Sequence, residues 1–424
     1  MKRRYLVHVE EPRRTDGCVE LAAVHEAPEG APWRVWYRVP EAWSDALTEL
    51  ADPFAVGSVQ QAMLHGCDLE VKGTVSRSLL ANLEDYVDVW HCWDESRYGR
   101  IEVGAAREAD GQVGGGAEAV CSFSGGVDAS FTVLRHVKGL AGRRSRKIGA
   151  AILVQGFDIP LGDTAGFEGA FARAAETLRN YGVPLVPVVT NWRDNGLDWF
   201  YAFGSAAISC LHLFQRRFRS GLIAGAENYA YQGSTGAHPL IDRMLGSSSF
   251  EIIHDGAGFT RSQKIALLAN EPPLLRGLRV CWEGARRDRN CGACEKCIRT
   301  ILNFRAMGLP RPEAFPTDVS IGQIRTLPIR NAAVLNEYRT IVSEAEQHGL
   351  GNERWVAALR RRLAGAEEDP SPNETTGPRQ VNPSDHRRND FAGNRPRQPA
   401  HAAIPDGGAR PSCADSVKPS RDTT

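Results

Sequence analysis

The chain has 424 residues, 42% of them hydrophobic, which is enough to bury the cores of two or three domains. Lys plus Arg and Asp plus Glu number 51 each, so the formal net charge is zero. Proteins that bind along nucleic-acid backbones usually carry a basic surplus, so nucleic acid is not the expected partner. The first residues lack the apolar segment of a secretory signal, and no apolar run reaches the length of about 18 residues that a membrane span needs. We therefore expect a cytoplasmic protein without membrane contact, with a homodimer as one option for its assembly.

Residues 1–105 are predicted to form a β-rich domain of unknown role. The stretches "WRVWYRVP" (33–40) and "LEVKGTVS" (69–76) favour β-branched and aromatic residues, with Gly and Pro between such runs. The stretch "SRSLLANLEDYVDVW" (76–90) reads as one helix or as a helix followed by a strand. The Gly-rich polar stretch "GAAREADGQVGGGAE" (104–118) then marks a domain boundary.

From residue 118 onward, short apolar runs alternate with helical patterns. The expected strands are "AVCSF", "KIGAAILVQGF", "PLVPVVTN" and "GLIAGAEN", and the apolar residues of 127–140 have helical spacing. Strands that alternate with helices of this length predict an α/β fold, a parallel doubly wound sheet with helices on both faces. We assign residues 106–275 to this domain.

The remainder of the chain divides into three segments. Residues 276–310 contain a cysteine cluster with a predicted helix behind it, and residues 311–366 are predicted to be helical. From residue 367 the composition changes to Pro, Ser, Asn, Asp and Arg. Such a segment cannot bury enough apolar surface to offset the entropy lost on ordering, so residues 367–424 are predicted to be disordered.

The stretch "AVCSFSGGVDASF" (119–131) joins a buried strand to a helix through Ser-Gly-Gly. Glycines let backbone N–H groups converge on a phosphate, and the start of the helix adds unpaired N–H groups and the positive end of its dipole. Ser124 and Ser130 add hydroxyl donors, whereas Asp128 implies a bridging divalent cation, Mg²⁺. No Walker-type lysine loop and no G-x-G-x-x-G after a strand is present. A tight turn with glycines for packing alone is the alternative interpretation.

The segment "SFSGGVDAS" resembles the S-G-G-x-D-S pyrophosphate loop of the ATP pyrophosphatase superfamily, whose members cleave ATP between its α and β phosphates. The resemblance makes residues 106–275 an ATP-binding domain with an adenine nucleotide alpha hydrolase-like fold. It implies that ATP and Mg²⁺ are bound by Ser124, Gly125, Gly126, Val127 and Asp128. The match departs at Ala129, where the family has Ser or Thr, and Ser130 stands about 100° further around the helix.

Further segments fit the same superfamily. Gln155 in "ILVQGFD" falls where a strand edge contacts adenine, and Gly225 in "IAGAEN" falls where a later strand reaches the nucleotide. The stretch "FTRSQKIALLA" resembles a motif whose basic residues, here Arg261 and Lys264, face the phosphates or the activated substrate. The resemblance therefore makes Asp128 and Lys264 the candidate catalytic residues. An amphipathic helix with solvated basic residues is the alternative.

Four cysteines are spaced as C-x9-C-x2-C-x2-C. A C-x2-C pair chelates one ion from a tight turn, which Gly292 eases, and the outlying cysteine completes a tetrahedron. The spacing predicts a Zn²⁺ site, with an iron–sulfur cluster as the chemical rival and unpaired structural cysteines as the plain alternative. Such a closed site is structural and not catalytic. The expected metal ligands are Cys281, Cys291, Cys294 and Cys297.

The loop and the cysteine cluster together resemble the 7-cyano-7-deazaguanine synthase family over residues 118–310. Those enzymes adenylate a carboxylate on a deazapurine, and ammonia then converts it through an amide to a nitrile. The resemblance implies a C–N bond-forming ligase that produces AMP and pyrophosphate from ATP, a small-molecule carboxylate and an ammonia-type donor. Two alternatives stay open: a tRNA-modifying enzyme that transfers sulfur or nitrogen, and a non-catalytic nucleotide- and zinc-binding module, which Ala129 favours.

Overall fold

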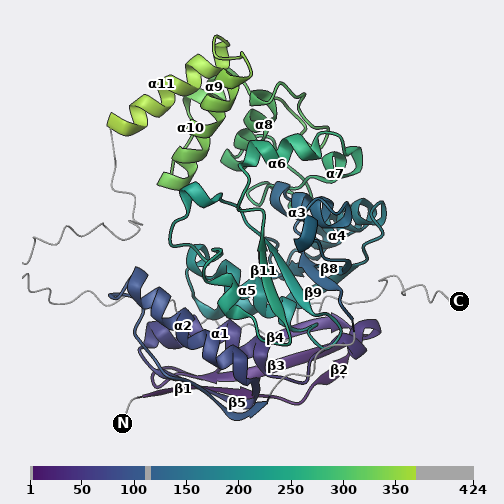
Figure 1. The fold of residues 1–424 in the computed structure, drawn as a ribbon, viewed down its shortest axis with the longest axis vertical. Helices are drawn as coiled ribbons and strands as arrows, with labels where there is room; N and C mark the ends of the chain where they lie inside the picture. Colours follow the sequence, from purple (N-terminus) through teal and green to yellow (C-terminus); the bar gives the residue numbers. More distant parts are fainter. Residues whose placement is uncertain (1–2, 110–115, 369–424) are drawn as a thin grey trace, which may run out of the picture.

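The computed structural model describes residues 3–109 and 116–368 (Figure 1). The predicted disorder of residues 367–424 falls almost entirely outside this part of the chain, as does the middle of the predicted boundary at 104–118. Within the described residues, no helix combines the length and apolar character that crossing a membrane requires.

One sheet contains all the strands that the structure describes, in the order β11-β10-β7-β8-β9-β4-β3-β1-β5-β6, with β2 paired to β3. The strands are β1 (Arg4–Val9), β2 (Arg13–Thr15), β3 (Cys18–Glu26), β4 (Trp33–Pro40), β5 (Asp68–Ser76), β6 (Val103–Ala109), β7 (Ala119–Ser122), β8 (Ile148–Gln155), β9 (Leu185–Thr190), β10 (Ser220–Ala224) and β11 (Glu251–Asp255).

Some helices cover the two faces of this sheet, and the others pack together in a separate helical layer. They are α1 (Asp52–His65), α2 (Arg77–Trp93), α3 (Val127–Val137), α4 (Thr164–Arg179), α5 (Trp199–His212), α6 (Arg261–Leu268), α7 (Pro272–Gly277), α8 (Glu295–Ala306), α9 (Ile321–Arg325), α10 (Ala332–Gln347) and α11 (Arg354–Glu368). Short 3-10 turns include η4 (Tyr229–Tyr231) and η5 (Asp242–Leu245).

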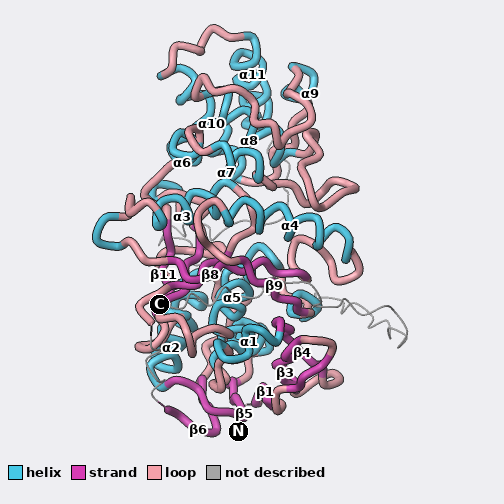
Figure 2. Tube along the Cα trace, turned by 90° about the vertical axis from the view of Figure 1, so that its right-hand side faces the viewer, coloured by secondary structure: helices cyan, strands magenta, loops and turns pink. Residues whose placement is uncertain are grey.

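The half of the sheet from β11 to β9 is parallel and doubly wound. The chain passes from β7 through β8 to β9 on one side, then returns to add β10 and β11 on the other. Helices α3 and α4 cover one face of this half and α5 covers the other, with α1 packed beside α5 (Figure 2). The α/β class and a mostly parallel central sheet are therefore confirmed, whereas the adenine nucleotide alpha hydrolase-like type stays a prediction.

The burial of strand β7 explains why its sequence is a continuous apolar run. Cys121 packs with the residues under α3 and α4, whereas its neighbour Val120 packs into the core on the opposite face. Successive side chains of a strand alternate between faces, and both faces here are covered. A continuous apolar run without alternation of polarity is the expected signature of such a strand.

The strands of residues 1–105 continue the same sheet. β4 pairs antiparallel with β9 through Tyr37 and Thr190, and the side chain of Asn191 extends this ladder by accepting from Trp36 N at 2.9 Å and donating to Arg34 O at 2.8 Å. One hydrophobic core cluster runs through both halves. The division into domains stays a prediction, but the strands on both sides of residue 105 belong to one sheet.

The N-terminal region also contains two helices. The stretch 76–90 was predicted to be a helix or a helix plus a strand; Ser76 ends β5, and residues 77–90 belong to the single helix α2. Helix α1 was not predicted, because nearly all its residues are buried between the sheet and α5, which removes the polar face that marks a surface helix.

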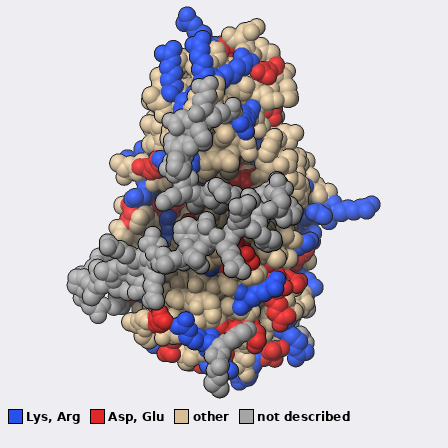
Figure 3. Space-filling model, turned by 90° about the vertical axis from the view of Figure 1, so that its left-hand side faces the viewer, with Lys and Arg blue, Asp and Glu red and all other residues tan. Residues whose placement is uncertain are grey.

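Helices α6 to α11 form a separate layer at the top of the molecule (Figure 1). Their hydrophobic core includes Ile265, Ile301, Tyr338 and Leu359, and the cysteines of the cluster pack in it. On the face drawn in Figure 3, Lys and Arg gather at the end formed by α10 and α11, and acidic and basic side chains mix lower down. The segment 311–366 contains α9, α10 and most of α11, joined by loops.

Candidate functional site

The strand order reverses at β7 and β10, so their carboxyl ends mark the place where a doubly wound sheet usually has its crevice. These strands are parallel neighbours, with Ser220 beside Ala119 and Leu222 beside Cys121. After β7 the chain enters α3 on one face, and after β10 it runs through η5, which contacts α5 and α2 on the other face. Ligands of doubly wound sheets bind where neighbouring strands send their connections to opposite faces.

The glycine turn after β7 lies in this crevice. Gly125 has a φ of 78°, in the left-handed region that favours glycine, and a Cβ there would lie 3.4 Å from the Arg279 Cβ. Arg279 braces the turn: its backbone N donates to Gly125 O at 2.8 Å, and its Nη1 donates to Ser124 O at 3.1 Å. Gly126 N donates to Ser124 Oγ at 3.3 Å. The turn is thus held in shape by the segment that leads to the cysteines.

Asp128 lies in the first turn of α3 with two cations beside it. Lys264 Nζ donates to its Oδ1 at 2.9 Å, and Arg261 Nη2 is 3.3 Å from its Oδ2. Lys264 Nζ also donates to Gly225 O at 2.5 Å, so α6 links the turn after β7 to the turn after β10. Burial alone would raise the pKa of Asp128, but Arg261 and Lys264 outweigh it and hold this pKa below its ordinary value.

The other predicted nucleotide contacts have different surroundings. Val127 and Ser130 are almost fully buried on α3. Gln155 ends β8, and its amide donates to Pro160 O and Leu161 O, so it holds the loop that follows its own strand. The structure thus brings Asp128, Lys264, Arg261, Gly225 and the glycine turn together, whereas a contact of Gln155 with adenine stays a prediction.

Further charged side chains, which were not predicted from the sequence, surround Asp128 and Arg261. Lys296, on α8, lies with its Nζ 4.0 Å from the centre of the Trp282 ring. Burial lowers the pKa of Lys296 to about 8, against the attraction of Asp158. Arg261 continues the network in the other direction, since its Nε is 3.3 Å from Glu337 Oε2. Arg299 also pairs with Glu337, and its Nε is 2.8 Å from Glu295 Oε1.

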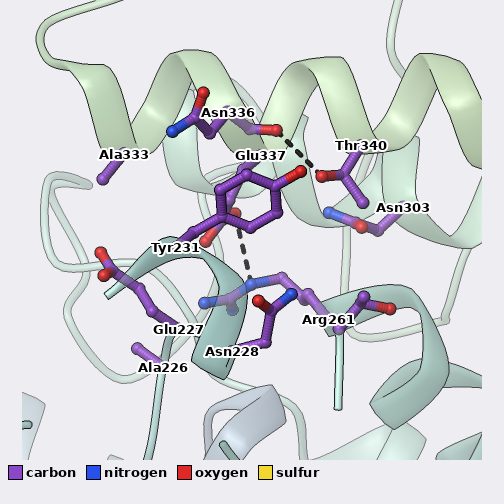
Figure 4. A pocket seen from close by; sticks show the side chains of 11 residues that line it. Ala226, Glu227, Asn228, Tyr231, Arg261, Asn303, Ala333, Asn336, Glu337 and Thr340 are labelled. Carbon is purple, nitrogen blue, oxygen red and sulfur yellow. Dashed lines mark hydrogen bonds and ion pairs between the residues drawn. The ribbon is translucent and has the colours of Figure 1, made fainter. Parts of the chain in front are cut away.

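A cavity opens on the far side of Arg261 from Asp128, with an accessible volume of about 40 Å³. Figure 4 shows that its walls come from the turn after β10, from α6, from α8 and from α10. The lining side chains are mostly polar, and Tyr231 stands at the mouth with 52% of its surface exposed. The cavity is lined by Ala226, Glu227, Asn228, Tyr231, Thr260, Arg261, Asn303, Ala333, Asn336, Glu337 and Thr340.

The two carboxylates of this cavity have opposite environments. Burial first and the nearby charge of Glu337 second raise the pKa of Glu227 above its ordinary value. Burial would also raise the pKa of Glu337, but Arg261 and Arg299 more than offset it and hold this pKa low. Glu337 is therefore a fixed anion, whereas Glu227 is the more basic carboxylate.

The four cysteines converge as their spacing predicts. Their Sγ atoms all lie within 4.8 Å of one another, with 3.9 Å between Cys291 and Cys297 and 3.7 Å between Cys294 and Cys281. Four sulfurs that bind one zinc ion at about 2.3 Å lie about 3.8 Å apart at the corners of a tetrahedron. The donor set and its geometry thus fit a four-thiolate metal ion, with zinc as the expected metal.

The cysteine thiols shift one another's pKa values in opposite directions. The hydrogen bond from Cys294 contributes most to a Cys281 pKa far below the ordinary value, and the same contact raises the pKa of Cys294 to about 12. Four crowded thiols without a cation ionise unequally because each thiolate opposes the next. A bound metal ion removes this opposition.

No model of a known protein family matches the chain, and neither the curated proteins nor the solved structures contain a match. The function of the site therefore has to be argued from the geometry of its residues.

Proposed function

We propose that the protein is an ATP-dependent ligase that adenylates a carboxylate, releases pyrophosphate and then joins the activated carbon to a nitrogen nucleophile. The observation that carries the proposal is the meeting of Asp128, Lys264 and Arg261 beside a glycine turn at the crevice between β7 and β10. A strand that enters a helix through such a turn suits a phosphate group. The reaction would resemble that of the 7-cyano-7-deazaguanine synthases, with an ammonia-type donor.

The state of Arg261 supports an anionic ligand. Its side chain is only 9% exposed, and its buried Nε donates no hydrogen bond of normal geometry to a described residue. A guanidinium has five N–H donors, and leaving them without acceptors in a buried position is costly. Arg261 turns its Nε toward Glu337 and its Nη2 toward Asp128. A phosphate oxygen in the crevice would accept from the Nη groups, which is the role that this proposal gives to ATP.

The proposed roles follow from the positions of the side chains. Lys264 and Arg261 orient the phosphates and neutralise the charge that develops when pyrophosphate leaves. Asp128 is the residue that would hold Mg²⁺, which when bound screens the phosphate charge. Backbone N–H groups at the start of α3 complete the cradle. The cysteine cluster, which has no open coordination position, would hold a structural zinc ion.

A sulfur-transfer reaction on tRNA is the less favoured candidate. Such chemistry needs a reactive thiolate near the loop, and the cysteine that precedes the loop is Cys121. Cys121 is fully buried, and its burial raises the pKa of the thiol to about 12, so it is a poor nucleophile. A gel shift with bulk tRNA tests this alternative directly, and tight binding would favour it.

Pyrophosphate release across a panel of carboxylates tests the ligase proposal. The panel includes the 7-carboxylate of 7-deazaguanine, and each acid is assayed with and without ammonium chloride. We expect carboxylate-dependent release of pyrophosphate with AMP as the nucleotide product. Binding of ATP without any release would instead favour the non-catalytic module that Ala129 allows.

A further inference from the structure

The cavity beyond Arg261 lies next to the reacting end of the proposed nucleotide site. A single side chain separates the two, because Arg261 approaches Asp128 Oδ2 at 3.3 Å with one nitrogen and Glu337 Oε2 at 3.3 Å with another. Figure 4 shows this guanidinium at the floor of the cavity, with Glu337 behind the Tyr231 ring. A group held in the cavity is therefore close to a carboxylate that is activated at the crevice.

The size of the cavity limits what it holds. Its accessible volume of about 40 Å³ corresponds to about three water molecules. An ammonia molecule or the terminal group of a primary amine fits this space, whereas a ring does not. The carboxylates of Glu227 and Glu337 line it, and such acceptors suit N–H donors.

The two glutamates of the cavity differ in the contacts that they make. Glu337 pairs with both Arg261 and Arg299. Glu227 forms no ion pair with any residue that the structure describes, and its polar contact is a hydrogen bond from the backbone of Gly233. Arg261, Arg299 and Glu337 face it from α6, α8 and α10. A carboxylate that is held by two guanidiniums is a weak base, whereas an unpaired and partly buried one accepts a proton readily.

We propose that Glu227 is the general base that deprotonates the nitrogen nucleophile in this cavity. The inference rests on the proposed ligase function. The nitrogen attacks the acyl carbon of the adenylate, a C–N bond forms, and the C–O bond to AMP breaks with its electron pair leaving on AMP. The proton lost by the nitrogen passes to a Glu227 carboxylate oxygen and then to solvent at the mouth beside Tyr231.

The test separates the two half-reactions in the full-length protein. Exchange of labelled pyrophosphate into ATP reports adenylation, and amide formation from the 7-carboxylate of 7-deazaguanine and ammonium chloride reports nitrogen attack. We expect Glu227→Gln to keep exchange within about twofold of the wild type while amide formation falls by about 100-fold or more. The matched control is Glu84→Gln, which makes the same change on the exposed face of α2 and should leave both rates unchanged.

A second variant guards against a purely structural effect. In Glu227→Ala, added formate or azide should restore part of the amide formation, because a small external base can enter the space that the side chain left. Loss of exchange along with amide formation in Glu227→Gln would overturn the assignment, as would amide formation at the wild-type rate. If the wild type itself shows no exchange with any carboxylate of the panel, the ligase proposal fails and the base assignment fails with it.

Discussion

The short segment 277–281 connects the glycine turn after β7 to the cysteine cluster, because Arg279 hydrogen-bonds to the turn and Cys281 belongs to the cluster. The side chains of these two regions are held differently. At the turn, Asp128 makes charged contacts of 2.9 and 3.3 Å that a ligand can exchange for its own. In the cluster, the sulfurs lie within 4.8 Å of one another, and Cys281 and Cys297 are buried in the core of helices α6 to α11. Under the proposed function, the turn serves binding and chemistry, whereas the cluster serves stability.

The largest effect is expected at the cluster. Cys294→Ser removes one sulfur of the tetrahedron, and structural zinc contributes about 10–16 kcal/mol to the folding of small zinc peptides. We expect zinc content to drop well below one ion per chain and the melting temperature to fall with it, as followed by elemental analysis and calorimetry. Cys92→Ser is the matched control, because Cys92 is exposed on α2. An unchanged melting temperature in Cys294→Ser would show that the metal ion does not stabilise the fold. Iron with acid-labile sulfide would show that the cysteines hold an iron–sulfur cluster and not zinc.

Asp128→Asn should have the opposite profile at the turn. It removes the charge that pairs with Lys264 and Arg261, and we expect turnover to fall by about 100-fold or more. Stability should fall by only about 1–3 kcal/mol, because the fold loses one polar contact set and no packing. Zinc content should not change. A variant that loses zinc together with activity would show that the two regions are not separate.

The two cavity glutamates give a comparison within the first region. Glu337→Gln takes the partner from two arginines and should destabilise the protein at pH 7 by about 1–3 kcal/mol. Glu227→Gln should slightly raise stability at pH 7. The pKa of Glu227 in the folded protein lies above the ordinary value, so the wild type loses stability as pH rises from the unfolded-state pKa to the folded-state pKa. The low pKa of Glu337 stabilises the wild type above its unfolded pKa, and this contribution is lost as pH falls through the folded pKa. Urea unfolding at pH 4 and pH 7 should therefore show that each variant differs less from the wild type in free energy of unfolding at pH 4. A Glu227→Gln variant that is less stable than the wild type at pH 7 would contradict the environment assigned to Glu227.

The smallest effects concern one glycine from each region. Gly125 and Gly292 have φ values of 78° and 74°, so alanine at either position costs about 1–2 kcal/mol of backbone strain. A Cβ at Gly292 would also lie 2.7 Å from Thr317 Oγ1. We expect Gly125→Ala to reduce turnover with normal zinc content, and Gly292→Ala to reduce zinc retention under chelator challenge. Equal effects of both changes on zinc would erase the distinction.

Local spacing explains which parts of the site were readable from the sequence. The residues of the glycine turn and the cysteines of the cluster each lie within a short stretch, so their types and spacing indicate how they are arranged in the fold. The parallel half of the sheet was readable because its strands are buried on both faces. β11 was missed, because its five residues include Glu251, His254 and Asp255 and so lack an apolar run.

The rest of the site depends on contacts between distant segments. Glu337 reaches the site from α10, and Arg279 braces the turn from a loop, and nothing near either residue in sequence signals these contacts. Glu227 stands only two residues after Gly225, yet its basicity comes from burial and from Glu337 across the cavity. Such environments exist only once the chain is folded. Lys264 and Arg261 were readable through the superfamily resemblance and not through any local rule.

Transfer of heavy oxygen from a labelled carboxylate to AMP tests the central proposal most directly. The wild-type protein is incubated with ATP, Mg²⁺ and a carboxylate whose two oxygens carry the label, and the nucleotide products are weighed by mass spectrometry. Adenylation joins a carboxylate oxygen to the α-phosphorus, and nitrogen attack then breaks the carbon–oxygen bond. The account therefore predicts AMP that carries one heavy oxygen, in an amount equal to the pyrophosphate released. Unlabelled AMP, or ADP and phosphate as the products, would contradict it.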